Sequence, residues 1–372
     1  MVKLLADVCK IQYGFPFNSA EFNDTKGMPL VRIRDVVRGY SETYTNEPCS
    51  DEYIVNNGDI LIGMDGEFNI ARWKGGKAYL NQRVCRLIPN KEIDSDFLFH
   101  YMPNILKKIE EETPFVTVKH LSAKQLNQVM LHLPNTETQK HIAAVLNMND
   151  NLIVIRKQQL AKLDELVKAR FVEMFGEPSI NPLGWPIRKF KDISIIITDG
   201  EHITPSRKKN GIYLLSARNI LNHMLKLDDV DYIDDDEYSR ISRRIIPQKG
   251  DVLISCSGSI GRCCVVPDRL KFQMVRSVAL IRFDSSVNPF FAEWLIASDE
   301  LQRQIAYSAT RSSQANLFQG KIKELQGYVP PKDLQDLFAG FVRQVNGSKD
   351  KILKALTQLE TLKKSLMQKY FG

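Results

Sequence analysis

The chain has 372 residues, of which 43% are hydrophobic and 26% are charged, and its net charge is +7. This length predicts two domains of ordinary size, and the composition is typical of a folded globular protein rather than a disordered one. The mild excess of Lys and Arg is compatible with nucleic acid as a partner, although the charge alone fits an ordinary basic protein equally well.

The sequence also excludes several locations. The N-terminal stretch MVKLLADVCKIQYGF has no long apolar segment, so we expect no secretory signal. No apolar run approaches the roughly 18 residues that a membrane-spanning helix needs. The six cysteines form no C-x-x-C pair, which favours free thiols in a reducing compartment. We therefore predict a cytoplasmic protein with no membrane partner.

Short strand signals dominate the first part of the chain. Residues 54–64 (IVNNGDILIGM) and 76–88 (GKAYLNQRVCRLI) are rich in apolar and β-branched residues, and Gly, Asn or Pro bound them, which predicts strands. Residues 94–112 carry apolar residues at helical spacing. This mixture predicts an α+β domain over residues 1–134.

A long helix is predicted next, in the region of residues 135–177. The segment after Pro134 contains neither Pro nor Gly before Gly176, and its regular apolar pattern covers residues 152–174. A narrow apolar stripe of this kind predicts an amphipathic helix that packs along one face. The residues that we expect to pack are Ile153, Leu160, Leu163, Val167 and Met174. The proline-rich segment EPSINPLGWP then ends the helix.

The second half repeats the same order of elements. GDVLISC (residues 250–256) and MVRSVALIRF (274–283) predict strands, and residues 288–306 have helical spacing, so residues 178–330 predict a second α+β domain. Residues 331–372 predict a second long helix. Its expected packing residues are Ile352, Leu356, Leu359 and Leu366. We expect the two helices to pack against each other, with each helix lying on its own globular domain as the alternative.

Matching segments show that the two halves form an internal repeat. PLVRIRDV begins 184 residues before YLLSARNI, and Gly58 lies 192 residues before Gly250. The spacing becomes 194 between Arg83 and Ser277, and 196 between His120 and Asn316. Because both order and spacing agree, we interpret the pattern as a duplication with short loop insertions rather than chance similarity.

Catalytic signatures are absent from the sequence. It has no glycine-rich dinucleotide loop, no phosphate-binding P-loop, no H-E-x-x-H, no G-x-S-x-G and no methyl-transfer motif. The six histidines do not cluster with cysteines at metal-ligand spacing. A duplicated chain without duplicated catalytic residues is more typical of a binding protein than of an enzyme. We therefore predict no catalytic residue, metal or cofactor in this chain.

Basic and polar side chains gather instead in the loops of both halves. Arg and Lys bind phosphates and guanine, and Asn and Gln can bind adenine. For any single Arg an exposed charge is the simpler explanation, but the repeated sets favour contact with DNA. The candidates in the first half are Arg32, Arg34, Arg72, Lys74, Lys77, Gln82, Arg83, Lys119 and His120. Those in the second half are Ser216, Arg218, Ser257, Ser259, Arg262, Arg276, Arg311, Gln314 and Asn316.

The acidic run DDVDYIDDDEY, residues 228–238, opposes this interpretation because carboxylates repel phosphates. We expect it to be a solvated loop that faces away from DNA. The alternative is that it contacts a basic patch on a partner protein.

The order of these parts resembles the DNA specificity subunit of type I restriction–modification enzymes. In the first half the resemblance is carried by DVCKIQYGFPFNSAEF, PLVRIRDV, GDILIGMDG, NQRV, TVKHLS and LHLP with ETQKHIA. In the second half it is carried by NPLGWPIRKFKDI, GDVLISCSGSIGR and SSQANLF. It covers nearly the whole chain. The second half departs from the family in one place, because KDLQDLFAGFVRQV lacks the usual proline-rich, Glu-Gln start of its long helix.

The resemblance implies two target-recognition domains separated by two long antiparallel helices, with pseudo-twofold symmetry. Each domain would read one half of a split site in double-stranded DNA. The subunit would be non-catalytic. It would bind two modification subunits, which carry S-adenosylmethionine and methylate adenine, and restriction subunits, which use ATP. Two other functions stay open, namely a stand-alone DNA-binding regulator and a degenerate fragment of a fused restriction–methylation enzyme.

Overall fold

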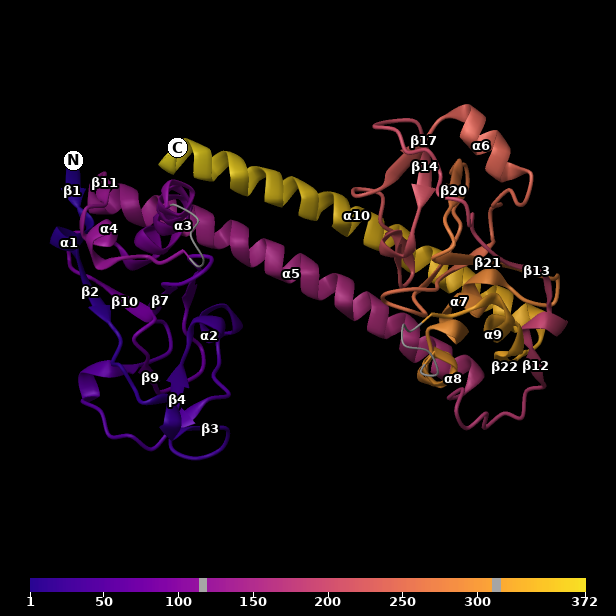
Figure 1. The fold of residues 1–372 in the computed structure, drawn as a ribbon, viewed down its shortest axis with the longest axis horizontal. Coiled ribbons are helices and arrows are strands. Elements are labelled where there is room, and N and C mark those ends of the chain that lie inside the picture. The colour runs from indigo at the N-terminus through magenta and orange to yellow at the C-terminus, as the bar shows by residue number, and fades with distance from the viewer. Residues whose placement is uncertain (114–118, 310–315) are drawn as a thin grey trace. The chain divides into compact units, whose positions relative to one another are not determined.

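The computed structural model describes residues 1–113, 119–309 and 316–372. The chain divides into two compact units: the first unit comprises residues 1–157 and 355–372, and the second unit comprises residues 158–354. Each unit contains one α+β domain, the start of one long helix and the end of the other (Figure 1). The compact units differ from the four predicted segments because both helices are shared between them.

The domain of the first unit consists mainly of short strands. Its elements are β1 (Val2–Leu4), α1 (Leu5–Val8), β2 (Cys9–Tyr13), η1 (Ser19–Glu21), β3 (Phe22–Asn23), β4 (Met28–Val31), α2 (Ile33–Arg38), β5 (Tyr44–Thr45), η2 (Asp51–Tyr53), β6 (Ile54–Val55), β7 (Ile60–Gly63), β8 (Ile70–Arg72), β9 (Ala78–Leu80), β10 (Val84–Pro89), α3 (Ser95–Glu112), α4 (Ala123–Asn127) and β11 (Met130–His132).

Two sheets form the body of the first unit. An antiparallel sheet has the order β2-β10-β7-β8, and a mixed sheet has the order β3-β5-β4-β9-β6, in which β4 and β9 run parallel. The central strand β7 is buried on both faces, because Ile60 and Ile62 pack into one hydrophobic cluster and Leu61 packs into another. This burial explains why β7 is a continuous apolar run rather than an alternating one.

The domain of the second unit has the same plan. Its elements are β12 (Ile187–Lys189), η3 (Phe190–Asp192), β13 (Ser194–Asp199), β14 (Ile212–Leu215), η4 (Ala217–Asn219), β15 (Ile220–Leu221), β16 (Met224–Leu225), β17 (Asp231–Ile233), α6 (Asp235–Ser242), β18 (Val252–Ser255), β19 (Cys263–Val265), β20 (Phe272–Met274), β21 (Val278–Phe283), α7 (Pro289–Ile296), α8 (Asp299–Ala309), α9 (Gln319–Glu324) and β22 (Gln326–Tyr328).

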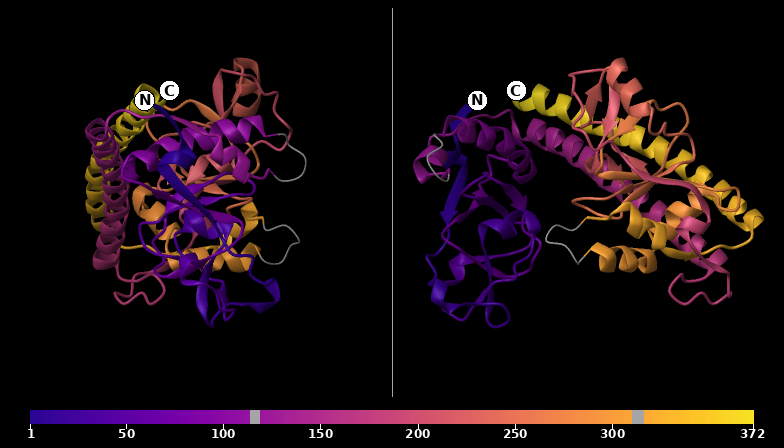
Figure 2. Two further views of the ribbon diagram at one scale, coloured as in Figure 1. Left: turned by 90° about the vertical axis from the view of Figure 1, so that its left-hand side faces the viewer. Right: turned by 45° about the vertical axis from the view of Figure 1, so that its right-hand side comes forward.

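The sheets confirm the internal repeat. The second unit has an antiparallel sheet in the order β13-β21-β18-β19, which corresponds to β2-β10-β7-β8, and its strands β14 and β20 run parallel like β4 and β9. Two further views show the strand-rich body of each unit beside the helix ends that belong to it (Figure 2). The predicted fold class, two mixed α/β domains with long helices, is confirmed.

The repeated Gly-Asp pair is a turn that leads into the central strand of each unit. Gly58 and Gly250 have φ angles of 94° and 88°, a conformation that glycine adopts without strain. The following carboxylates close the turn: Asp59 accepts the Asn56 N–H at 2.9 Å, and Asp251 accepts the Gln248 N–H at 2.7 Å. This part of the repeated segment therefore has a structural role.

One predicted helix is interrupted. Residues 288–306 have helical spacing throughout, but the structure divides them into α7 and α8. Ser298 lies at the break, where its hydroxyl donates to Leu295 O at 2.6 Å and accepts the Leu301 N–H at 3.4 Å. A serine that caps the next helix in this way explains why the first one stops.

The two long helices are α5 (Thr136–Phe175) and α10 (Lys332–Phe371), each with 40 residues. The first is longer than the 152–174 stripe because it also packs on the first domain through Ile142, Ala143 and Leu146. No helix within residues 1–113, 119–309 and 316–372 combines the length and apolar character needed to cross a membrane.

Both long helices start in the same way, although the second lacks the expected family sequence. Gln139 is 1% exposed; its amide donates to Glu92 O at 3.1 Å and Pro134 O at 3.0 Å. Gln335 is fully buried and donates to Ser286 O at 3.0 Å and Pro330 O at 2.8 Å. One buried glutamine therefore anchors each helix to its own domain.

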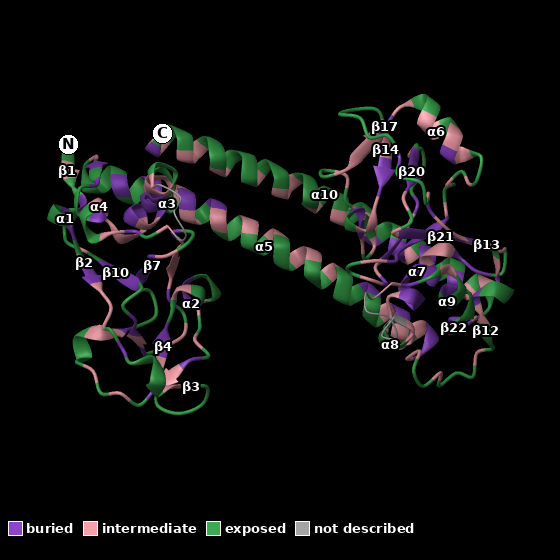
Figure 3. Cartoon of the chain, viewed as in Figure 1, coloured by how far each residue is buried: buried purple, intermediate pink, exposed green. Residues whose placement is uncertain are grey.

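The helices run antiparallel within each unit. In the first unit, Asn149 donates to Leu359 O at 3.3 Å and Asp150 pairs with Lys363 at 2.7 Å. In the second unit the Phe171 and Phe338 rings lie 5.4 Å apart. Later residues of α5 thus meet earlier residues of α10. Figure 3 shows that the buried helix positions lie toward the helix ends, with alternating half-buried and exposed positions elsewhere.

Both predicted modes of helix packing occur. Val167 is buried in the core of the second unit, and Leu163 and Met174 pack against that core. Leu366 packs against the core of the first unit. The remaining expected packing residues are half-buried: Ile153, Leu160, Ile352, Leu356 and Leu359. The helices therefore contact each other and also lie on the globular domains. The first turns of α5 (Ile142, Leu146) and of α10 (Phe338, Val342) pack on the domain that precedes each helix, whereas the later residues named above pack on the other domain.

The free cysteines differ in accessibility. Burial raises the pKa of the Cys9, Cys85 and Cys256 thiols to about 12 and also raises that of Cys263 and Cys264. Half-buried Cys49 is the most accessible of the six. The thiolate is the reactive form, so a maleimide at about pH 8 should label Cys49 first and the others only after denaturation. Mass spectrometry of the labelled peptides checks this, and rapid labelling of native Cys256 would contradict it.

Candidate DNA interface

The loops that carry the candidate residues are held by a hydrogen-bond frame that occurs in both units. In the first unit the Gly14 N–H donates to Val84 O at 3.1 Å, the Met64 N–H donates to Arg83 O at 3.0 Å, and the Leu121 N–H donates to Met64 O at 2.7 Å. In the second unit the Gly200 N–H donates to Val278 O at 2.9 Å, the Cys256 N–H donates to Ser277 O at 2.8 Å, and the Leu317 N–H donates to Cys256 O at 2.9 Å. The frame thus fixes three loops of each unit beside one another.

This frame requires glycine at one position. A Cβ atom on Gly14 would lie 2.1 Å from Asn81 O, and a Cβ atom on Gly200 would lie 2.4 Å from Met274 O. Any side chain at Gly14 would push the end of β2 away from the turn after β9. Any side chain at Gly200 would likewise push the end of β13 away from the end of β20. The same close approach in both units shows that their loops share one geometry.

A short backbone bridge brings distant candidates together. His120 pairs with Asp65 in an isolated antiparallel bridge, and Asn316 pairs with Ser257 in the equivalent bridge of the second unit. Three of these four residues were predicted to contact DNA. Asp65 was not, although it lies in the glycine-bearing loop GMDG.

A pocket in the first unit gathers four of the predicted residues. Its volume is about 400 Å³, and its lining consists of Phe17, Ser19, Phe22, Arg32, Ile33, Arg34, Asn81, Gln82 and Arg83. The Arg34 and Arg83 side chains are 56% and 54% exposed. The Arg32 guanidinium lies 5.8 Å from the centre of the Phe22 ring. Cations and an amide beside an aromatic ring are the groups that bind phosphates and base edges.

Asp65 joins this pocket to the bridge. Its Oδ1 lies 2.5 Å from Nδ1 of His120, and its Oδ2 lies 3.5 Å from Nε of Arg83. A carboxylate beside Nε restricts the orientation of the guanidinium and leaves the terminal nitrogens of that guanidinium available for other acceptors. The signal that could have found Asp65 is its position in a loop that matches Ser257.

The other candidates of the first unit lie outside the pocket. Arg72 on β8 donates to Gly58 O at 2.8 Å, pairs with Asp96 and lies over the Phe99 ring, so it ties α3 to the sheet. The Lys119 ammonium donates to Glu110 O at 2.5 Å. Lys74 and Lys77 are exposed in the turn between β8 and β9. Among these four, the two exposed lysines have the freedom that a DNA contact needs.

In the second unit, Ser216 and Arg218 occupy places equivalent to Arg32 and Arg34. The Ser216 N–H donates to buried Asn219 at 2.9 Å, just as the Arg32 N–H donates to buried Asp35 at 2.9 Å. Burial raises the pKa of the Asp35 carboxyl. Each short helical turn is therefore held by a buried side chain, Asp35 or Asn219, and the residue just before it, Arg34 or Arg218, has an exposed guanidinium.

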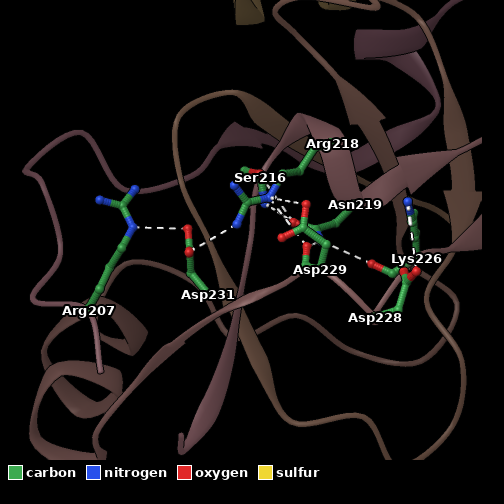
Figure 4. A network of polar contacts seen from close by, with 8 residues as sticks. All are labelled: Arg207, Ser216, Arg218, Asn219, Lys226, Asp228, Asp229 and Asp231. Carbon is green, nitrogen blue, oxygen red and sulfur yellow. Dashed lines mark hydrogen bonds and ion pairs between the residues drawn. The ribbon is translucent and has the colours of Figure 1, made fainter. Parts of the chain in front are cut away.

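The acidic run is more than a solvated loop, because it includes β17 and the first residues of α6. Most of its carboxylates pair with basic residues of the same unit. The pairs shown in Figure 4 are Asp228 with Lys226, Asp229 with Arg218, and Asp231 with Arg207 and Arg218. The further pairs are Asp234 with Lys208, Asp235 with Lys271, and Glu237 with Arg240. The expected repulsion of DNA is therefore largely compensated within the domain.

The remaining candidates of the second unit are spread over its loops. Arg276 and Ser259 are exposed, and Ser257 and Arg262 are half-buried. Arg311 and Gln314 lie outside the described residues. Arg207 was missed by the sequence reasoning, although it stands in the basic turn SRKKN. Within the described part of the chain, no three His, Cys, Asp or Glu residues form a group that could hold a metal ion.

Comparison with known proteins shows sequence similarity to type I restriction specificity subunits. Residues 1–165 match the type I restriction modification DNA specificity domain. The chain is 28% identical to the type I restriction enzyme EcoBI specificity subunit of Escherichia coli, over 98% of this chain and 84% of that protein. It is 21% identical to the type I restriction enzyme MjaVIII specificity subunit of Methanocaldococcus jannaschii, over 91% of this chain and 87% of that protein.

The fold is similar to those of two solved chains from type I restriction–modification systems. The S subunit of the type I restriction–modification system of M. genitalium gives a TM-score of 0.65 at 14% identity, over 100% of this chain and 96% of that one. A chain of another type I system gives 0.54 at 16% identity, over 100% of this chain and 97% of that one. The chain is thus similar, over nearly its whole length in sequence and in its fold, to specificity subunits of type I restriction–modification enzymes.

Proposed function

We propose that this chain reads a bipartite site in double-stranded DNA, with one half-site for each α+β domain. The observation that carries the proposal is the repeated loop frame, which presents arginines at equivalent places in two units. Arg34 of the first unit is equivalent to Arg218 of the second, and Arg83 is equivalent to Ser277, which Arg276 directly precedes. Arginine is the side chain that most often bonds guanine, and it also binds phosphates.

The proposed partners follow from the internal symmetry. Two equivalent units with antiparallel helices offer two equivalent surfaces, and such a chain suits two copies of one partner. We propose two modification subunits, which would carry S-adenosylmethionine and methylate adenine, and restriction subunits that use ATP to cleave. The complex would act in the cytoplasm, where the host DNA lies.

Two other functions make different predictions. A stand-alone regulator would bind DNA without a methyltransferase partner, and a degenerate fused enzyme would retain methyl transfer by itself. Co-expression with a candidate modification subunit, followed by purification and mapping of methylated adenines in the host genome, tests the proposal. A split methylated motif that depends on this chain supports it. Methyl transfer by the rigorously purified chain alone, or no association with a modification subunit, would contradict it.

Replacing Arg83 with alanine should weaken specific binding about tenfold and relax one position of one half-site, because a guanine contact contributes about 1–3 kcal/mol. Binding of the full chain to a randomised duplex library measures this. The Lys107→Ala variant is the control, because Lys107 lies on α3 outside the pocket and its side chain is 76% exposed. If Arg83→Ala leaves affinity, preference and salt dependence unchanged, Arg83 is not a contact residue.

A further inference from the structure

A single carboxylate lies between two arginines beside the mixed sheet of the second unit. Asp231 Oδ1 accepts from Nη2 of Arg218 at 3.0 Å, and Oδ2 accepts from Nε of Arg207 at 3.0 Å. Asp231 is on the edge strand β17, Arg218 is on η4 and Arg207 is in the loop before β14 (Figure 4). Three separate segments of the domain thus converge on this carboxylate.

These contacts leave terminal N–H groups of both guanidinium groups available to bond a base. Arg218 also donates from Nε to Asp229 O at 3.3 Å, so its Nε side is held by the protein. Among the described residues, Nη1 of Arg218 and both terminal nitrogens of Arg207 have no hydrogen-bond partner. Figure 4 shows the terminal nitrogens of Arg207 pointing away from Asp231. A guanidinium held on one side can still offer two parallel N–H groups to an acceptor pair.

The cluster around Asp231 has no net charge, which favours recognition of bases over simple attraction to phosphates. Arg207, Arg218 and Lys226 face Asp228, Asp229 and Asp231, so three cations meet three anions. A neutral cluster attracts the DNA backbone weakly, because nonspecific binding depends on net neutralisation of phosphates. The arginines of the cluster can still form directional hydrogen bonds. In the major groove, the acceptor pair that matches two parallel N–H groups is O6 and N7 of guanine.

The repeat relates this cluster to the pocket of the first unit. Arg218 corresponds to Arg34, which lines that pocket together with Arg83. Within the described part of the chain, the Arg34 guanidinium donates only to a neutral hydroxyl, Thr43 Oγ1 at 3.1 Å, and its Nε lies 3.8 Å from the Asp35 carboxylate. Arg218 has an additional carboxylate support from β17. The two half-sites would therefore be read by equivalent arginines that are held in different ways.

We infer that Asp231 is a positioning residue that holds Arg218 and Arg207 as guanine-reading side chains of the second half-site. The inference rests on the proposed DNA-reading function. It adds Arg207 to the interface and gives one carboxylate of the acidic run a role in recognition. Asp231 itself does not contact the base.

The test compares Asp231→Asn with Asp235→Asn in the full chain. Asp235 belongs to the same acidic run and pairs with Lys271 at 3.0 Å, so both substitutions remove one negative charge. Each variant is incubated with a randomised duplex DNA library, and the bound duplexes are sequenced at several salt concentrations. We expect Asp231→Asn to lower discrimination for guanine at one or two positions of one half-site by about tenfold, and Asp235→Asn to leave it unchanged.

Arg218→Lys provides a second variant, which keeps the charge but loses the planar fork. It should relax the same position while nonspecific affinity and the thermal unfolding temperature stay close to those of the wild type. Equal gains in affinity for all duplexes in both aspartate variants, without a change in preference, would overturn the inference because the carboxylate would act only by repulsion. If the wild-type chain selects no motif at all, the proposed function fails instead.

Discussion

Phe175→Ala and Phe371→Ala should each lower the free energy of unfolding of one unit by about 3–5 kcal/mol, the usual cost of removing a buried Phe side chain. Phe175 is fully buried, and its ring lies 4.9 Å from that of Phe291 in the second unit. Phe371 is 6% exposed, and its ring lies 4.7 Å from that of Tyr101 in the first unit. The end of each long helix is thus anchored in a domain core.

Hydrogen exchange with mass spectrometry can assign the two effects. Phe175→Ala should accelerate exchange in residues 158–354, and Phe371→Ala should accelerate it in residues 1–157. Leu166→Ala and Leu362→Ala are matched controls, because these equivalent helix residues are 49% and 48% exposed. Each control should change the free energy of unfolding by less than about 0.5 kcal/mol. Equal loss from the phenylalanine and leucine variants would show that the helix ends are not the anchors.

Exchange of the second domain with that of a relative should replace one half of the recognised DNA motif and leave the other half unchanged. The structure supplies suitable junctions, because β12 pairs with β22 and the Val329 N–H donates to Pro186 O at 2.9 Å. Residues 187–329 therefore begin and end at adjacent points. The transplanted segment should keep an aromatic residue at Tyr328, whose hydroxyl donates to Gly176 O at 2.9 Å.

Selection from a randomised duplex library, or mapping of methylated adenines in a complete complex, measures the outcome. The control chain carries only the junction residues of the relative, and it should keep both half-sites. A change in both half-sites would show that the domains do not read DNA independently. A folded exchange chain with an unchanged motif would place the reading residues outside residues 187–329.

The sequence by itself determined the main strands, the long helices and the duplication. The Ile60-Leu61-Ile62 run and the glycine before it predict a buried strand after a turn, because both signals are local. The absence of Pro and Gly between Pro134 and Gly176 likewise predicts α5. The repeat can be read from offsets alone, since duplicated segments keep their order. The helix starts at Thr136, well before the apolar stripe of residues 152–174, because its first turns pack on the first domain.

The candidate interface was predicted only in part. The loops around Arg34, Gln82 and Arg83 were identified, and the structure brings these residues together at one pocket. Local sequence did not reveal that Arg72 is committed to Asp96, or that Asp65 faces Arg83 and His120. A charge is visible in the sequence, but its partner is not, because ion pairs join residues that only the folded chain makes neighbours.

Tertiary structure alone decided how the long helices are used. Their apolar stripes predict packing but do not say on what, and the structure places one end of each helix in each compact unit. It also shows that Gln335 anchors α10 as Gln139 anchors α5, although the sequences around them differ. Such anchoring depends on buried carbonyl groups from distant segments. A buried amide is therefore recognised only when the fold shows which backbone groups it must satisfy.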